Sequence, residues 1–233
     1  MGRQNYIAFS LALSIIAFAA SADCAGSEVF GGYTGAPDLE YGTIGGVAAL
    51  SKELNADGFL ARGDAGYGQY SYDRRGNPGI NADMTNVDLM AGYQKFFGNG
   101  RVALYVGGDY ENTSLNKTDR SNSATGSEFG IKGAADARLN FDDKTFADMK
   151  GSYSTAFNTY WANGRFGYNM GRFAMGPEVG FLGNDAFDQQ RIGGFIGDIH
   201  ILSSLNASVS VGYAHTDLFS DGVYGDVSLA LAF

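Results

Sequence analysis

Over residues 128–141, one set of alternate residues is uninterrupted by charge, and the other set carries all the charged side chains. Phe129 and Ile131 fall on one side of this segment, while Lys132 and Arg138 fall on the other. A period of two is that of a β-strand, whose successive side chains point to opposite faces. Charges of both signs on the polar face are costly in the core of a β-sandwich but suit a water-filled lumen. This segment therefore predicts a strand with one face toward lipid and one toward a lumen.

The same pattern recurs along the chain and predicts twelve strands. They cover residues 27–34, 39–51, 58–72, 84–97, 101–113, 126–141, 147–155, 160–170, 172–183, 191–203, 206–216 and 223–233. Their apolar faces begin or end on aromatic residues, as is typical at a membrane interface. A strand in lipid must pair all its backbone groups, which only a closed sheet allows. We therefore predict an all-β fold, a closed antiparallel transmembrane β-barrel over residues 23–233, with a soluble β-sandwich as the alternative.

The connections between the predicted strands alternate in length. Those at residues 98–100 and 142–145 belong to a mostly short set. The other set is mostly longer, with loops predicted at residues 73–83, 114–125, 184–190 and 217–222. Short periplasmic turns alternating with longer external loops are typical of outer-membrane barrels.

The first residues predict export across the inner membrane. Arg3 precedes an uncharged apolar run at residues 7–20, and small residues follow up to Ala22. This pattern is that of a signal peptide over residues 1–22, and the run is too short for a membrane-spanning helix. Cys24 leaves a lipoprotein as an alternative, although Asp23 stands where a small residue is usual. Together with the strand pattern, the signal peptide predicts a location in the outer membrane of a Gram-negative cell.

The last strand ends on Phe233, with Leu229 and Leu231 on the same apolar face. We expect these three residues to form the signal that the barrel-assembly machinery reads. The expected surroundings of the finished barrel are outer-membrane lipids.

Composition and motifs exclude several functions. The formal net charge of −9 makes nucleic acid an unlikely partner, because phosphate binding needs clustered Lys and Arg. The two histidines, His200 and His215, are expected at opposite rims of the barrel, so they cannot share a catalytic site. We predict no catalytic residues, no metal site and no cofactor. An outer-membrane enzyme that modifies lipids remains an alternative.

The inward charges have two interpretations: a network of ion pairs that plugs the lumen, or the lining of a pathway. Aromatic residues of the same inward parity, Tyr70, Tyr72 and Trp161 among them, favour contact with a glycan, whose C–H faces stack on aromatic rings. Tyrosines at strand ends are also ordinary rim residues, so packing at the rim is the competing interpretation.

Three segments resemble the cellulose biosynthesis protein BcsS family of proteobacteria. They are GYGQYSYD at 66–73, GSYSTAFNTYWANGRFGY at 151–168 and RFAMGPEVGFLGNDAFDQQRIGGF at 172–195. The resemblance implies a non-enzymatic outer-membrane barrel accessory to cellulose biosynthesis, assisting export or surface anchoring of this exopolysaccharide. Cellulose and other cellulose-export subunits would be its partners. A small structural or porin-like barrel unrelated to cellulose is the alternative. The glycan contact is predicted at Trp161, Tyr160, Phe157, Tyr70 and Tyr72.

Overall fold

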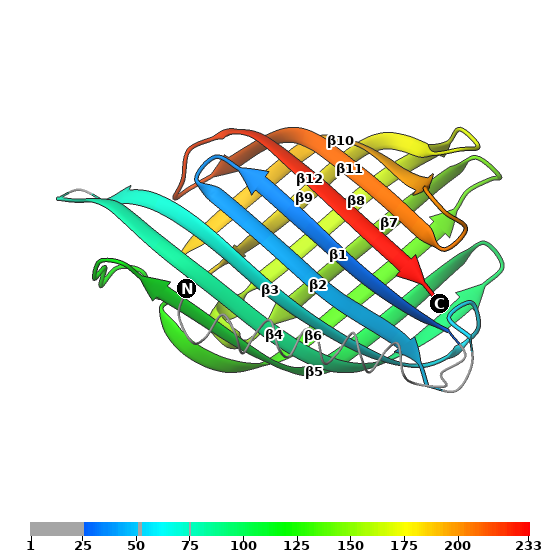
Figure 1. Cartoon of the computed structure of the whole chain (residues 1–233), viewed down its shortest axis with the longest axis horizontal. Helices are drawn as coiled ribbons and strands as arrows, with labels where there is room; N and C mark the ends of the chain where they lie inside the picture. Colours follow the sequence, from blue (N-terminus) through cyan, green and yellow to red (C-terminus); the bar gives the residue numbers. More distant parts are fainter. Residues whose placement is uncertain (1–25, 51–52, 75) are drawn as a thin grey trace.

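The computed structural model describes residues 26–50, 53–74 and 76–233 and shows a closed antiparallel β-barrel (Figure 1). Each strand pairs with its neighbours in sequence, and the last strand pairs back with the first. The strands are β1 (Ser27–Ala36), β2 (Leu39–Ala49), β3 (Gly58–Arg74), β4 (Asn77–Phe97), β5 (Gly100–Leu115), β6 (Gly126–Asn140), β7 (Thr145–Ser154), β8 (Tyr160–Asn169), β9 (Ala174–Asn184), β10 (Phe187–His200), β11 (Leu205–Thr216) and β12 (Gly222–Ala232). A short 3-10 turn, η1 (Ala156–Asn158), precedes β8.

The predicted fold class is confirmed, with twelve strands in the described part of the chain. The predicted signal peptide at residues 1–22 and the cysteine at position 24 lie outside the described residues. No helix among the residues that the structure describes is long and apolar enough to cross a membrane.

The alternation of residues sorts the side chains between the two faces of the wall, as the pattern on β6 predicts. Phe129 is 81% exposed and Ile131 is 66% exposed on the outer face. The lumen face carries Lys132 and Arg138, which form ion pairs with Asp88 and Asp198.

Exposed aromatic rings form a belt at each end of the outer face. The end at which β1 begins and β12 ends, called here the termini end, carries Phe59, Tyr93, Phe97, Phe141, Phe166 and Tyr168. The opposite end, the loop end, carries Tyr33, Tyr67, Phe129, Tyr153 and Tyr213. Exposed aliphatic side chains such as Leu89, Leu104 and Val211 lie between them. An apolar band between aromatic girdles is the outer surface of a barrel that spans a membrane.

The prediction of loops over residues 73–83 and 184–190 is wrong, because strands extend into both ranges. β3 and β4 run on to Arg74 and Asn77 as a hairpin that projects at the left of Figure 1, and β10 begins at Phe187. The polar, glycine-rich composition of both segments predicts loops. Pairing continues because Ile80 and Phe187 bury their side chains inside the barrel.

Candidate functional site

Paired charges cross the middle of the lumen. On the wall formed by β8 to β12, the Glu178 carboxylate is 2% exposed and accepts hydrogen bonds from Arg165, from Ser210 at 3.0 Å and from Tyr224 at 3.0 Å. Such a carboxylate is stable only because every partner is in place. This part of the lumen is a fixed structural network.

The opposite wall holds three carboxylates side by side. Asp64, Asp88 and Asp109 lie in direct register on β3, β4 and β5. Like charges in register destabilise a sheet, so this row needs cations. Lys132 contacts Asp88 at 2.5 Å, and Arg62 contacts Asp64 at 3.0 Å. In the described part of the chain, no group of three or more His, Cys, Asp or Glu residues could hold a metal ion.

An apolar cluster lies inside the barrel at the loop end. Tyr70 and Tyr72, which are 2% and 5% exposed, pack with Leu39 and Ile80. The Tyr70 ring also lies 5.1 Å from that of Phe219, in the loop between β11 and β12. The two tyrosines are therefore covered in this structure.

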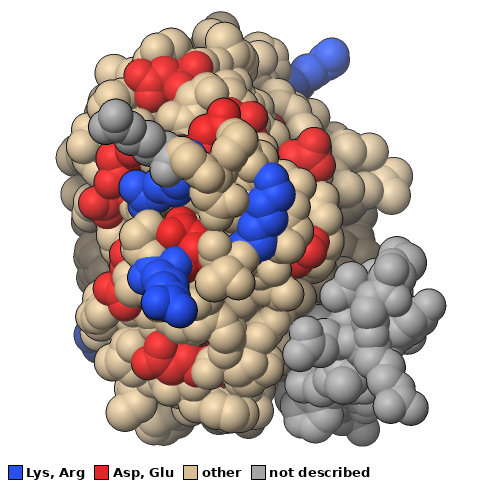
Figure 2. Space-filling view, turned by 90° about the vertical axis from the view of Figure 1, so that its left-hand side faces the viewer, with Lys and Arg blue, Asp and Glu red and all other residues tan. Residues whose placement is uncertain are grey.

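The strap, defined as residues 116–125 between β5 and β6, holds this cluster in place. Asn122 donates hydrogen bonds to the hydroxyls of Tyr70 and Tyr72, and Ser123 donates one at 2.8 Å to the carbonyl oxygen of Asp185, between β9 and β10. The strap thus runs from the β5–β6 side of the mouth to the β9–β10 turn. Figure 2 looks onto this end, where basic and acidic side chains are mixed over the surface.

A strip of accessible lumen remains against β6, β7 and β8. The register places Trp161 beside Ser152 and Leu182, with the same parity as Asn163 and the lumen-facing Arg165. Trp161 is 41% exposed and lies near the loop end, and Lys150, two residues from Ser152, is also exposed. We call Trp161, Ser152, Asn163 and Lys150 the lumen strip. It combines one aromatic face with hydroxyl, amide and ammonium donors.

The structure does not bring the five predicted glycan residues together. Tyr160 points outward and donates to Asp188 on the outer face of β10, whereas Trp161 points inward. Phe157 is buried in η1 with a φ of 48°. Of the five predicted residues, only Trp161 belongs to the lumen strip. Asn122 could not be found by sequence reasoning, because nothing in a polar loop marks one amide for burial.

The histidines lie as predicted, at opposite ends of the barrel. His200 ends β10 at the termini end. His215 lies near the loop end of β11, where its Nδ1 is 2.8 Å from Asp221. No hydrogen bond joins His215 to a serine or cysteine among the residues described here.

The fold is that of an outer-membrane β-barrel, and three solved structures illustrate it. The KdgM porin in complex with disordered oligogalacturonate aligns with a TM-score of 0.52 at 13% identity, over 88% of this chain and 99% of that chain. The translocator domain of the autotransporter NalP from Neisseria meningitidis gives 0.51 at 10% identity, over 99% and 96%. The TodX deltaS2S3 mutant monoaromatic hydrocarbon channel gives 0.53 at 7%, over 95% and 92%. At these identities the likeness concerns the fold alone.

Among curated proteins, none matches the chain. The family described as cellulose biosynthesis protein BcsS matches residues 25–233. The chain therefore belongs to this family, and the resemblance in the sequence is confirmed. Family and fold together support a cellulose-associated barrel and fit a location in the outer membrane.

Proposed function

We propose that this protein is a non-enzymatic barrel that assists the export or surface anchoring of cellulose, and that the glycan contacts the lumen strip. The observation that carries the proposal is the position of Trp161, the chain's one tryptophan, on the accessible lumen wall. Its working partners are cellulose, outer-membrane lipids, the barrel-assembly machinery and other cellulose-export subunits.

The chemistry of the strip suits a neutral polyhydroxy chain. An aromatic ring has a negative face that attracts the weakly positive C–H groups of a sugar ring. Ser152, Asn163 and Lys150 offer hydrogen-bond donors on the same wall for hydroxyl oxygens. Because Trp161 and these donors lie on adjacent, rigid strands, their relative positions are fixed before the glycan arrives.

Passage of a chain through the loop end requires the strap to move. In the closed position the strap holds Tyr70 and Tyr72 over the mouth by hydrogen bonds from Asn122. Surface anchoring, by contrast, needs no opening. The state of the strap thus distinguishes export from anchoring.

The test measures the amount of cellulase-sensitive glucan at the cell surface. It compares a deletion strain with strains that carry variants of the protein. Deletion should lower the glucan, and Trp161→Ala should lower it with an unchanged amount of folded barrel. Tyr153→Ala, which removes an outward aromatic ring from the neighbouring β7, is the matched control. Normal glucan in the deletion strain would end the proposal. A loss in the Tyr153 variant equal to that in the Trp161 variant would remove Trp161 from the site.

A structural or porin-like barrel is the second candidate, and the ion pairs around Glu178 and Asp88 favour its structural form. Steady conductance in planar bilayers that cello-oligosaccharides do not block would support the porin.

A further inference from the structure

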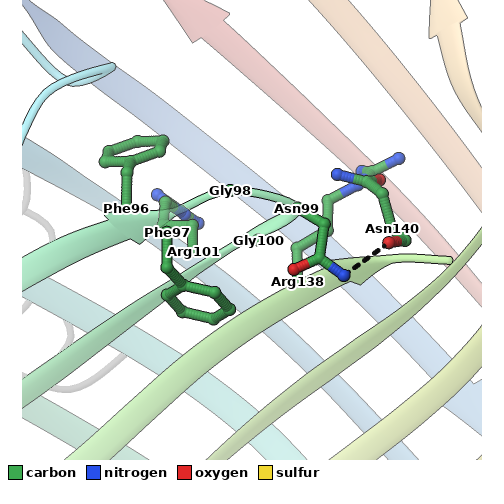
Figure 3. Close-up of a pocket in the computed structure, with 8 residues that line it drawn as sticks. All are labelled: Phe96, Phe97, Gly98, Asn99, Gly100, Arg101, Arg138 and Asn140. Carbon is green, nitrogen blue, oxygen red and sulfur yellow. Dashed lines mark hydrogen bonds between the residues drawn. The ribbon is translucent and has the colours of Figure 1, made fainter. Parts of the chain in front are cut away.

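A pocket of about 290 Å³ lies at the termini end of the barrel, away from the lumen strip (Figure 3). It is formed by the tight turn between β4 and β5 and by the last residues of β6. Its lining residues are Phe96, Phe97, Gly98, Asn99, Gly100, Arg101, Arg138 and Asn140. No acidic residue lines it.

Two arginines of the pocket lie in direct cross-strand register. Arg101 on β5 pairs with Arg138 on β6. Arg138 is held by Asp198 at 2.9 Å and by Asp148 at 3.5 Å, and its guanidinium lies 3.9 Å from the centre of the Phe146 ring. None of these three residues lines the pocket, so they hold Arg138 from outside it.

Arg101 has no such compensation. Among the described residues, no carboxylate lies within ion-pair distance of its guanidinium. Like charges directly opposite each other destabilise a strand pair, and here the destabilisation is not relieved at Arg101 by the protein itself. The chain therefore keeps an uncompensated positive charge in a small concave site.

The rest of the lining is suited to holding a ligand against that charge. The Asn99 amide donates at 3.0 Å to the Asn140 carbonyl oxygen, and the Asn140 amide N–H donates at 2.7 Å to the Asn99 carbonyl oxygen. This clamp fixes the turn to β6 and leaves the Asn140 side chain at the pocket. The rings of Phe96 and Phe97 lie on opposite sides of Arg101 in Figure 3, so apolar surface flanks this side chain. Apolar surface beside a charge strengthens its hydrogen bonds by lowering the local dielectric constant.

We propose that this pocket binds the carboxylate or phosphate group of a ligand that arrives from the termini side, with Arg101 as its main contact. A guanidinium matches such groups because its planar fork donates two parallel hydrogen bonds. The ligand's negative charge would compensate that of Arg101. The proposed anion site is separate from the proposed contact with cellulose, which is a neutral polymer.

The experiment uses the full barrel purified in detergent, with trigalacturonate as the carboxylate probe, inorganic phosphate as the phosphate probe and cellohexaose as the neutral probe. Calorimetry should detect binding of trigalacturonate and of phosphate. Any binding of cellohexaose should be the same in the wild type and in Arg101→Gln. Arg101→Gln should weaken anion binding about tenfold or more, because it removes the charge and the forked hydrogen bonds. Arg101→Lys keeps the charge but removes the fork, so it should recover only part of the affinity.

Lys95→Gln is the matched control, because Lys95 carries the same charge at the same end of the barrel but on its outer face. Equal loss in the Lys95 and Arg101 variants would overturn the pocket in favour of diffuse attraction. Binding of cellohexaose that depends on Arg101 would overturn the anionic ligand. A further arm places the barrel in nanodiscs with or without phosphatidylglycerol. If only phosphatidylglycerol binds, and Arg101→Gln abolishes this binding, the pocket is supported and a lipid headgroup is its ligand. If none of the probes binds in any arm, the proposed anion site is overturned.

Discussion

Asn122 donates a hydrogen bond of 3.0 Å to the hydroxyl of Tyr72, from which it is separated by 50 residues of chain. The same amide group reaches the Tyr70 hydroxyl at 3.1 Å, and Asn122 is 4% exposed. A buried amide is costly to leave without partners, so the strap is fixed over the lumen rather than mobile like an ordinary surface loop. In this structure the strap therefore lies fixed across part of the loop end.

Tethering the strap tests whether that closure must be released. A Ser123→Cys/Asp185→Cys barrel, in a Cys24→Ser background that removes the chain's one cysteine, can be joined by a short reducible thiol crosslinker. If export needs an open strap, the joined barrel should stop displaying cellulose, and reduction should restore it. Ser123→Cys alone, treated in the same way, is the control. Undiminished cellulose with the strap joined would leave surface anchoring as the role.

Acid should loosen the strap through Asp119. Hydrogen bonds from the Ser121 hydroxyl and amide, and further from Tyr72, hold the pKa of Asp119 below its usual range. A lowered pKa means that the stabilisation is present above the unfolded value of about 3.9 and is lost as the pH falls through the folded value. Bilayer current should therefore rise below about pH 4.

The control for this acid response is Asp142, a turn residue at the termini end whose pKa is lowered in the same way by the amides of Lys144 and Thr145. Asp119→Asn should conduct already at neutral pH, whereas Asp142→Asn should keep the wild-type profile. Identical profiles for Asp119→Asn and the wild type would show that the strap does not depend on this carboxylate.

The strands and their two faces could be predicted from the sequence because alternation is a local property. The starts of β4 at Asn77 and β10 at Phe187 could not, since the polar composition there predicts loops. Burial of Ile80 and Phe187 against distant strands decides those segments. The burial of Asn122 could not be predicted for the same reason, because it depends on two tyrosines of another hairpin. Trp161 could be assigned to the lumen by parity, but parity alone did not tell that Tyr70 and Tyr72 are covered.

A charge on the lipid face should destabilise the barrel much more than the same charge in the lumen. Ala135 is exposed on the outer face of β6, beside Leu104 and Gly151. Ala135→Arg should cost about 2–4 kcal/mol near the bilayer midplane. Ser152→Arg places the same group one residue from Gly151, on the lumen wall, and should cost far less. Urea unfolding in liposomes measures both, and equal costs would contradict the assignment of the faces.

Removing one partner of the buried pair between Arg165 and Glu178 should be severe. Arg165→Met leaves the Glu178 carboxylate buried without its cation, at a cost of about 3–5 kcal/mol. Arg165→Met/Glu178→Gln also removes the charge, so this double variant should be more stable than Arg165→Met alone. The same unfolding measurement checks the order of the two variants. A double variant that is less stable than Arg165→Met would mean that Glu178 is stabilised mainly by Ser210 and Tyr224.

The role of the chain end in assembly can be separated from its role in stability. Leu229 and Phe233 lie exposed on the outer face of the barrel, and Leu231 shares their parity between Val29 of β1 and Leu205 of β11. Phe233 is tied to Ser27 through its backbone, at 2.8 Å, and its ring is 64% exposed. Phe233→Asp should therefore leave the folded barrel nearly as stable as before. Insertion in cells should nevertheless fall sharply if the assembly machinery reads this ring.

Phe141→Asp is the control for this last prediction, because Phe141 is an aromatic residue at the same end of the barrel and is 56% exposed. The folded, heat-modifiable form on gels measures insertion in cells, and refolding into liposomes without the machinery measures intrinsic folding. We expect Phe233→Asp to reduce the first much more than the second, and Phe141→Asp to affect both alike. If the two variants behave alike in both assays, Phe233 acts only as an interfacial anchor, and the apolar end of β12 carries no assembly signal.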